Sequence, residues 1–172
     1  MSVGTIGVIG AGTMGGGIAQ AAATNGGLDV ILIDVSEAAV SKGIDAVGRR
    51  LAGAVAKGKM SAAEKDAALR RIRGATAYAD LKPADVVIEA ATENYDLKVK
   101  ILKQIDPVVR AEAIIATNTS SLSITKLASA CISSTRCQSW PWSKSSAGCR
   151  PATPRTPRSR RSRRGWANRR SP

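Results

Sequence analysis

The chain has 172 residues, enough for one domain or one and a half, and its apolar content of 44% is typical of a globular protein. Aromatic residues make up only 3% and phenylalanine is absent, so we expect Ala, Val, Ile and Leu to form the core. No stretch is long and apolar enough to resemble a signal peptide or a membrane span. We therefore expect a cytoplasmic location and no membrane partner.

The net charge of +13 is concentrated in the last quarter of the chain. Residues 1–130 hold all 13 acidic residues and 15 of the 26 basic ones, whereas residues 131–172 hold the other 11 basic residues and no acid. All three cysteines and all three tryptophans also follow Ala130. We predict a globular domain over residues 1–130 and a disordered basic tail over residues 131–172, and we predict no metal site.

Apolar runs alternate with helical patterns along the predicted domain. The predicted strands occupy residues 5–9, 29–35, 75–78, 85–90 and 113–117. The predicted helices occupy residues 13–24, 36–57, 61–73, 94–105 and 123–130, and Ser61 with Glu64 forms a capping box. This alternation predicts an α/β fold with a Rossmann-type, doubly wound and mostly parallel sheet. The helical pair between the second and third strands is an insertion into the smallest version of that fold.

A glycine-rich turn links the first strand to the first helix, with the spacing G-x-G-x-x-G at Gly10, Gly12 and Gly15. We expect Gly10 to allow a tight turn, Gly12 to let the backbone approach a pyrophosphate, and Gly15 to let helix and strand pack closely. The N-terminus of the following helix offers unpaired N–H groups to phosphates. The pattern predicts a dinucleotide site, and the alternative is a flexible turn without a ligand.

Asp34 lies 19 residues after Gly15, at the end of the second predicted strand. A carboxylate at this place can accept hydrogen bonds from both ribose hydroxyls of an adenosine, and its charge repels a 2′-phosphate. The spacing therefore favours NAD over NADP as the cofactor. The alternative is an aspartate that only caps the next helix.

Polar side chains lie at the ends of the fourth and fifth predicted strands, where open α/β sheets bind their ligands. Glu89, Thr92 and Glu93 follow the fourth strand, and a surface ion pair of Glu93 with Lys98 is the simpler interpretation of those charges. Residues 118–121, Asn-Thr-Ser-Ser, offer short polar groups near a nicotinamide, although such a run is typical of a loop and helix cap. The chain contains no histidine, the commonest general base near pH 7.

Four segments together resemble the 3-hydroxyacyl-CoA dehydrogenase family, and the bacterial 3-hydroxybutyryl-CoA dehydrogenases in particular. They are Gly-Ala-Gly-Thr-Met-Gly-Gly-Gly-Ile-Ala-Gln from Gly10, Ile-Asp at 33–34, Ile-Glu-Ala-Ala-Thr-Glu-Asn from Ile88, and Thr-Asn-Thr-Ser-Ser-Leu-Ser-Ile from Thr117. The resemblance covers residues 3–130 with the motifs in the family's order. It implies NAD-dependent oxidation of an L-3-hydroxyacyl-CoA, such as 3-hydroxybutyryl-CoA, to the 3-ketoacyl-CoA in fatty-acid or butanoate metabolism.

The resemblance also implies roles for individual residues. By position, Ser120 would bond the reacting oxygen of the substrate, which makes it the predicted catalytic residue. Asp34 would hold the adenosine ribose, and Glu93 and Lys98 would lie beside the cofactor, which replaces the surface-pair interpretation. The full set of predicted cofactor-binding residues is Gly10, Ala11, Gly12, Thr13, Met14, Gly15, Gly16, Asp34, Glu93, Lys98 and Asn118.

The sequence departs from the family after Ala130. The family continues with His-Phe-Phe-Asn-Pro-Val-Pro and a later Glu, which supply the catalytic base, a cofactor contact and the carboxylate that orients the base. Permitted codons for residues 131–138 encode the same seven residues when the third base of each codon joins the first two of the next. We therefore expect an out-of-frame tail, and a chain without the catalytic histidine or the helical domain that forms the family's homodimer.

Two other functions stay open at the level of sequence. A chain without the histidine could act as a non-catalytic NAD-binding module. The tail, in which Arg160-Arg161 and Arg163-Arg164 precede Trp166, could instead bind nucleic acid through its phosphates. We favour an acyl-CoA substrate as the partner and do not expect nucleic acid.

Overall fold

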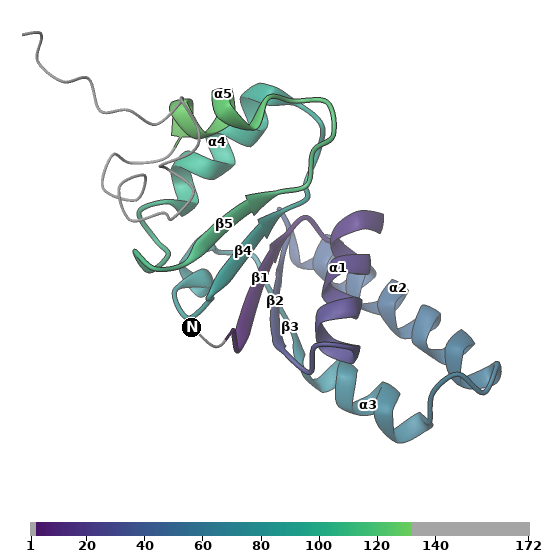
Figure 1. Cartoon of the computed structure of the whole chain (residues 1–172). Helices are drawn as coiled ribbons and strands as arrows, with labels where there is room; N and C mark the ends of the chain where they lie inside the picture. The colour runs from purple at the N-terminus through teal and green to yellow at the C-terminus, as the bar shows by residue number, and fades with distance from the viewer. Residues whose placement is uncertain (1–2, 132–172) are drawn as a thin grey trace, which may run out of the picture.

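A computed structural model describes residues 3–131 of the chain, and these residues form five parallel strands in the order β3-β2-β1-β4-β5 (Figure 1). The strands are β1 Thr5–Ile9, β2 Asp29–Ile33, β3 Ile72–Ala75, β4 Val86–Glu89 and β5 Ile114–Thr117. The helices are α1 Thr13–Thr24, α2 Glu37–Ala56, α3 Ala62–Arg70, α4 Tyr95–Ile105 and α5 Ile124–Cys131, with a 3-10 helix η1 at Tyr78–Leu81. The predicted Rossmann-type parallel sheet is confirmed. The predicted disorder of the tail lies outside the described residues.

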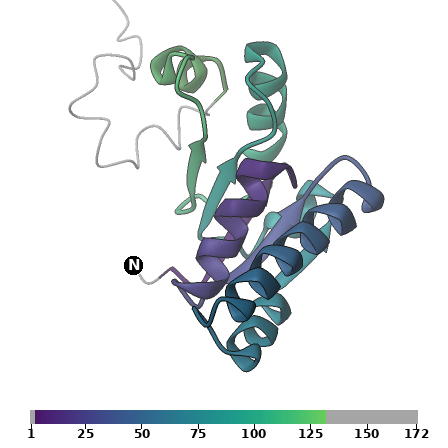
Figure 2. The same ribbon diagram turned by 90° about the vertical axis from the view of Figure 1, so that its right-hand side faces the viewer.

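Helices cover both faces of the sheet, α1 to α3 on one and α4 with α5 on the other (Figure 1, Figure 2). Successive residues of a strand point to opposite faces. Val8 and Leu32 accordingly pack with α1 and α2, whereas Ile9 and Ile33 pack with α4. The central strands are continuously apolar because both of their faces are buried.

Local capping signals set the beginnings of the inserted helical pair α2 and α3. Ser36 is the N-cap of α2, and its hydroxyl accepts a hydrogen bond from the backbone N–H of Ala39. At α3 the Ser61 hydroxyl accepts from the backbone N–H of Glu64, and the Glu64 carboxylate accepts from that of Ser61. The predicted capping box and helical pair are therefore confirmed.

The third strand lies earlier in the chain than the sequence predicts. We expected a helix to about residue 73 and a strand over residues 75–78, but α3 ends at Arg70 and β3 occupies Ile72–Ala75. Ile72 pairs with Val30 of β2 and is buried in the core. Pairing with β2 decides the position of this strand, because neighbouring residues of the same segment suit a helix equally well by local propensity.

The chain reverses its direction of travel across the sheet next to β1. From β1 it proceeds outward through β2 to β3, and it then returns to place β4 and β5 on the opposite side of β1. Such a switch point opens a crevice beyond the carboxyl ends of the two central strands. The loops that follow β1 and β4 therefore meet at the place where this class of fold binds ligands.

Candidate functional site

Three glycines shape the loop after β1, each for a different steric reason. Gly10 has φ +101°, and a Cβ on it would lie 2.7 Å from the carbonyl oxygen of Ala90 beyond β4. A Cβ on Gly15 would lie 1.8 Å from the carbonyl oxygen of Gly10. A Cβ on Gly12 would meet no atom within 4 Å. Packing within the protein therefore explains the first and third glycines, and open space for a ligand is left at Gly12.

The amino end of α1 begins in that open space. Its N-cap is Gly12, which has no side chain to satisfy the first-turn N–H groups. Thr13 and Met14 are exposed in this turn, whereas Gly16 is buried. A Cβ on Gly16 would lie 3.0 Å from a guanidinium nitrogen of Arg50 on α2. Free N–H groups at a helix N-terminus, with a cation close by, suit a phosphate.

Asp34, directly after β2, is joined to the glycine loop. Its Oδ2 accepts a hydrogen bond from the backbone N–H of Ala11 at 2.7 Å, and its Oδ1 accepts one from Val35 at 2.7 Å. The helix-cap interpretation is wrong, because Ser36 is the N-cap of α2. Each carboxylate oxygen has lone pairs left for a ligand hydroxyl, since an ionised carboxylate accepts about four bonds.

A cavity of about 370 Å³ lies between the glycine loop and α2. Three basic residues of α2 line it, Lys42, Arg49 and Arg50, and the spacing of seven and eight residues puts them on one helical face. Gly43 keeps α2 close, because a Cβ there would lie 2.6 Å from the carbonyl oxygen of Ala11. Sequence reasoning missed this basic face, although the spacing of the three cations could have revealed it. Its other lining residues are Ala11, Gly12, Thr13, Asp34, Ala39, Gly43 and Ala46.

Lys98 on α4 is completely buried rather than on the surface. Its Nζ lies 2.7 Å from Oε2 of Glu89, also fully buried, and 3.9 Å from Oε2 of Glu93. The surface-pair interpretation is therefore wrong. Lys98 precedes the buried Ile101 and Ile105 by three and seven residues, and this helical spacing could have indicated its burial.

The loop after β5 is tied to Glu93. The Glu93 carboxylate accepts hydrogen bonds from the hydroxyls of Thr119 and Ser121, the second at 2.6 Å, and from the backbone N–H of Ser121 at 3.3 Å. The bonds from Ser121 and Thr119 lower the pKa of Glu93 from 4.5 to about 2. Ser120 lies between these two residues and is exposed, and Asn118 opens the loop directly after β5. The loop is held to the edge of the sheet rather than serving only as a helix cap.

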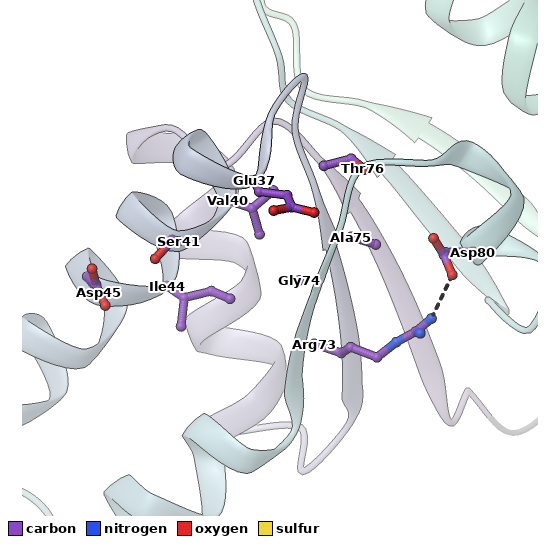
Figure 3. A pocket seen from close by; sticks show the side chains of 10 residues that line it. All are labelled: Glu37, Val40, Ser41, Ile44, Asp45, Arg73, Gly74, Ala75, Thr76 and Asp80. Carbon is purple, nitrogen blue, oxygen red and sulfur yellow. Dashed lines mark hydrogen bonds and ion pairs between the residues drawn. The ribbon is translucent and has the colours of Figure 1, made fainter.

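A second cavity of about 460 Å³ lies between α2 and the edge strand β3, and its lining residues include Arg73 and Asp80, which form an ion pair at 3.4 Å (Figure 3). None of the predicted site residues lines it. The predicted residues gather instead around the loops that follow β1, β2, β4 and β5, so the structure brings them to one edge. Their individual roles stay predictions.

No helix within residues 3–131 has the length and apolar character needed to cross a membrane. The same residues contain no cluster of three or more His, Cys, Asp or Glu side chains suited to a metal ion.

Comparisons with known proteins agree with this geometry. The family model described as "3-hydroxyacyl-CoA dehydrogenase, NAD binding domain" matches residues 5–140. A 3-hydroxybutyryl-CoA dehydrogenase of Bradyrhizobium diazoefficiens is 45% identical over 125 residues, 73% of this chain and 42% of that protein. A 3-hydroxyadipyl-CoA dehydrogenase of Escherichia coli is 41% identical over 128 residues, 74% of this chain and 27% of that protein.

A solved structure of an (S)-3-hydroxybutyryl-CoA dehydrogenase from Ralstonia eutropha is 57% identical, with a TM-score of 0.74, over 78% of this chain and 47% of that one. The chain spans less than half the length of each of these three relatives. The sequence resemblance to the family and the assignment of NAD as cofactor are confirmed. This chain belongs to the 3-hydroxyacyl-CoA dehydrogenase family, as an example of its NAD-binding domain.

Proposed function

We propose that this domain binds NAD across the carboxyl edge of the sheet, with the pyrophosphate on the backbone of residues 10–16. The observation that carries this proposal is the open space at Gly12, where no atom beyond residues 11–13 lies within 4 Å of the position that a Cβ would take. Gly10 and Gly15 are required by contacts within the protein, but no contact among the described residues requires Gly12 to be a glycine. Close approach of a pyrophosphate supplies that requirement.

Residues that follow β2, β4 and β5 make the remaining contacts with the cofactor. Asp34 accepts hydrogen bonds from the adenosine ribose, and its negative charge disfavours the 2′-phosphate of NADP. Glu93 lies beside the cofactor, the buried Lys98 lies behind Glu93, and Asn118 lies near the nicotinamide ring. The arrangement is supported by the bond between Asp34 and Ala11, which places the carboxylate next to the glycine loop.

The reaction we propose for an enzyme containing this domain is oxidation of an L-3-hydroxyacyl-CoA to the 3-ketoacyl-CoA. Bound NAD supplies the hydride acceptor. Ser120 hydrogen-bonds the reacting oxygen of the substrate, and this role is supported by its exposed position at the edge. The basic face of α2, Lys42, Arg49 and Arg50, supplies positive charge for the phosphates that NAD and acyl-CoA both carry.

The proposed oxidation also needs a group that takes the hydroxyl proton, and the chain contains no histidine. Loss of a general base typically lowers a rate by about 10²- to 10⁴-fold. We therefore propose that this polypeptide binds NAD with little turnover. Turnover can be measured in the reverse direction, as the rate of NADH oxidation with acetoacetyl-CoA, for this chain and for an intact family member. A comparable rate for the two proteins would refute the proposal.

The experiment that tests the cofactor site is the substitution Gly12→Ala. The new methyl group meets no atom beyond the adjoining residues 11 and 13, so the free protein should lose only about 1 kcal/mol of unfolding free energy, the cost of alanine at an N-cap. NAD affinity should fall at least about tenfold, because the methyl group occupies the approach to the pyrophosphate. Isothermal titration calorimetry with NAD and thermal unfolding measure the two effects. Unchanged NAD affinity in Gly12→Ala would contradict the proposed pyrophosphate position.

We also propose that residues 131–172 are read out of frame. The support is that permitted codons for residues 131–138, read in the shifted frame, encode the seven residues with which the family continues after the serine motif. The nucleotide sequence of the gene across codons 128–140 is the direct test. A gene whose shifted frame encodes other residues would exclude this origin for the tail. The cytoplasmic location expected from the sequence stays a prediction.

A further inference from the structure

A fully buried ion pair lies beneath the proposed site, and the proposed function uses only its lysine. Glu89 at the end of β4 and Lys98 on α4 are both 0% exposed. The free energy lost when two charges are removed from water cancels much of the free energy gained from their attraction, so a buried ion pair is weak evidence of stabilisation. A contribution to the geometry of the neighbouring loops is a second reason for its presence.

The Glu89 carboxylate joins three other segments at this edge. Its Oε2 accepts hydrogen bonds from Nζ of Lys98 at 2.7 Å and from the hydroxyl of Thr117, at the end of β5, at 2.6 Å. Its Oε1 accepts one from the backbone N–H of Ala91 at 2.9 Å. One side chain thus connects the ends of β4 and β5, the loop after β4 and the first turns of α4.

Lys98 extends these connections to the loop that holds Ser120. Its Nζ lies 3.5 Å from the carbonyl oxygen of Asn118 and 3.9 Å from the carboxylate of Glu93. Glu93 in turn bonds the residues on either side of Ser120. A continuous set of polar contacts therefore runs from the buried Glu89 to the Glu93 carboxylate, which faces the proposed cofactor, and to the loop that holds Ser120, which faces the proposed substrate.

We propose that Glu89 is a positioning residue, which acts through Lys98 and Thr117 to hold the loop of residues 118–121 and the Glu93 carboxylate in place for NAD. The inference rests on the proposed function, because it takes Glu93 and the loop to face the cofactor. Glu89 itself is fully buried and contacts the ligand only through these neighbours.

Asp85 provides a matched control at the opposite, amino end of β4. Its Oδ2 accepts hydrogen bonds from the backbone N–H groups of Gly4 and Thr5 at 2.8 and 2.9 Å, and its Oδ1 pairs with Arg110. Like Glu89, it is a carboxylate held by backbone N–H and a cation. Asp85→Asn should therefore disturb the fold by a similar chemical change, remote from the loop of residues 118–121.

The test compares Glu89→Gln with Asp85→Asn in the full 172-residue chain, with two measurements. Calorimetric titration with NAD should show at least about a tenfold loss of affinity for Glu89→Gln and less than about a threefold change for Asp85→Asn. Amide NMR spectra without NAD should show shifted or broadened signals of Thr119, Ser121 and Leu122 only in Glu89→Gln. A purely structural role would lower the unfolding temperature and leave these loop signals unchanged in the folded protein.

Thr117→Val keeps the test decisive if Glu89→Gln does not fold, because it removes only the hydroxyl that donates to Glu89 and preserves the shape of the side chain. It should weaken NAD binding and shift the same loop signals, to a smaller extent. Unshifted loop signals in a folded Glu89→Gln or Thr117→Val variant would overturn the positioning role. A wild-type chain that does not bind NAD would instead refute the proposed function, and the loop signals would still decide the role of Glu89.

Discussion

Two backbone segments approach each other very closely at Gly15, and the substitution Gly15→Ala tests how tightly α1 is packed on the glycine loop. A methyl group there would lie 1.8 Å from the carbonyl oxygen of Gly10 and 3.3 Å from a side-chain carbon of Val8. Ordinary contact begins at 3.4 Å, so α1 and the loop must separate by about 1.6 Å. Gly10 is itself held in place, because its backbone N–H donates a hydrogen bond to the carbonyl oxygen of Ile33 at 2.7 Å.

Overpacking of a core that can relax costs about 1–3 kcal/mol. At Gly15 the atom in contact is backbone rather than the end of a side chain, so we expect a loss of unfolding free energy of about 3 kcal/mol or more. Gly17 is the matched control on the same helix, since a methyl group there meets nothing within 4 Å. Gly17→Ala should raise stability by up to about 1 kcal/mol, because alanine is the better helix former.

Urea unfolding followed by circular dichroism measures both variants, and calorimetry measures NAD affinity in those that fold. Gly15→Ala should also weaken NAD binding, because separation of α1 from the loop moves the helix N-terminus that we assign to the pyrophosphate. The reasoning would be refuted by a Gly15→Ala protein whose unfolding free energy lies within about 0.5 kcal/mol of the wild-type value.

Three further predictions concern single contacts. Ser61→Ala removes the capping box of α3, so thermal or urea unfolding should show a loss of about 1 kcal/mol with NAD affinity unchanged; no loss of stability would contradict the role of the cap. Hydrogen bonds from Thr5 and Gly4, with that from Arg110, lower the pKa of Asp85 from 3.8 to about 2. The ionised Asp85 therefore stabilises the fold fully above the unfolded-state pKa of 3.8, and this stabilisation disappears as the pH falls to the folded-state pKa of about 2. The unfolding temperatures of wild type and Asp85→Asn should therefore converge between about pH 4 and pH 2, and a constant difference would contradict the assignment. Asp34→Asn should reduce the preference for NAD over NADP about tenfold or more, because it removes the charge that repels a 2′-phosphate; titration of both cofactors measures the ratio, and an unchanged ratio would exclude Asp34 from the ribose site.

Features that depend on a few neighbouring residues could be predicted before the fold was known. The glycine spacing predicted a strand, a tight turn and a helix, and the structure has a Gly10 with φ +101° and a Gly15 in backbone contact. Ser61 and Glu64 predicted the start of α3, because a capping box is completed within four residues. Alternation of apolar strands with helices was sufficient for the fold class. In each case the physical cause of an element lies in its own residues and their immediate neighbours, and the fold class follows from the order of these elements.

Features that depend on a partner in another helix or strand were settled only by assembly of the domain. Pairing with β2 placed β3 at Ile72 rather than at residue 75, against a local pattern that extends the helix. Packing of α4 on the sheet buried Lys98 and left Leu97 exposed, although local spacing also suits Leu97 for the buried face. Lys98 could be buried only because Glu89, nine residues earlier on another element, supplies the compensating charge. Charge pairing and strand pairing form when the elements come together, so these parts of the site appear only in the folded domain.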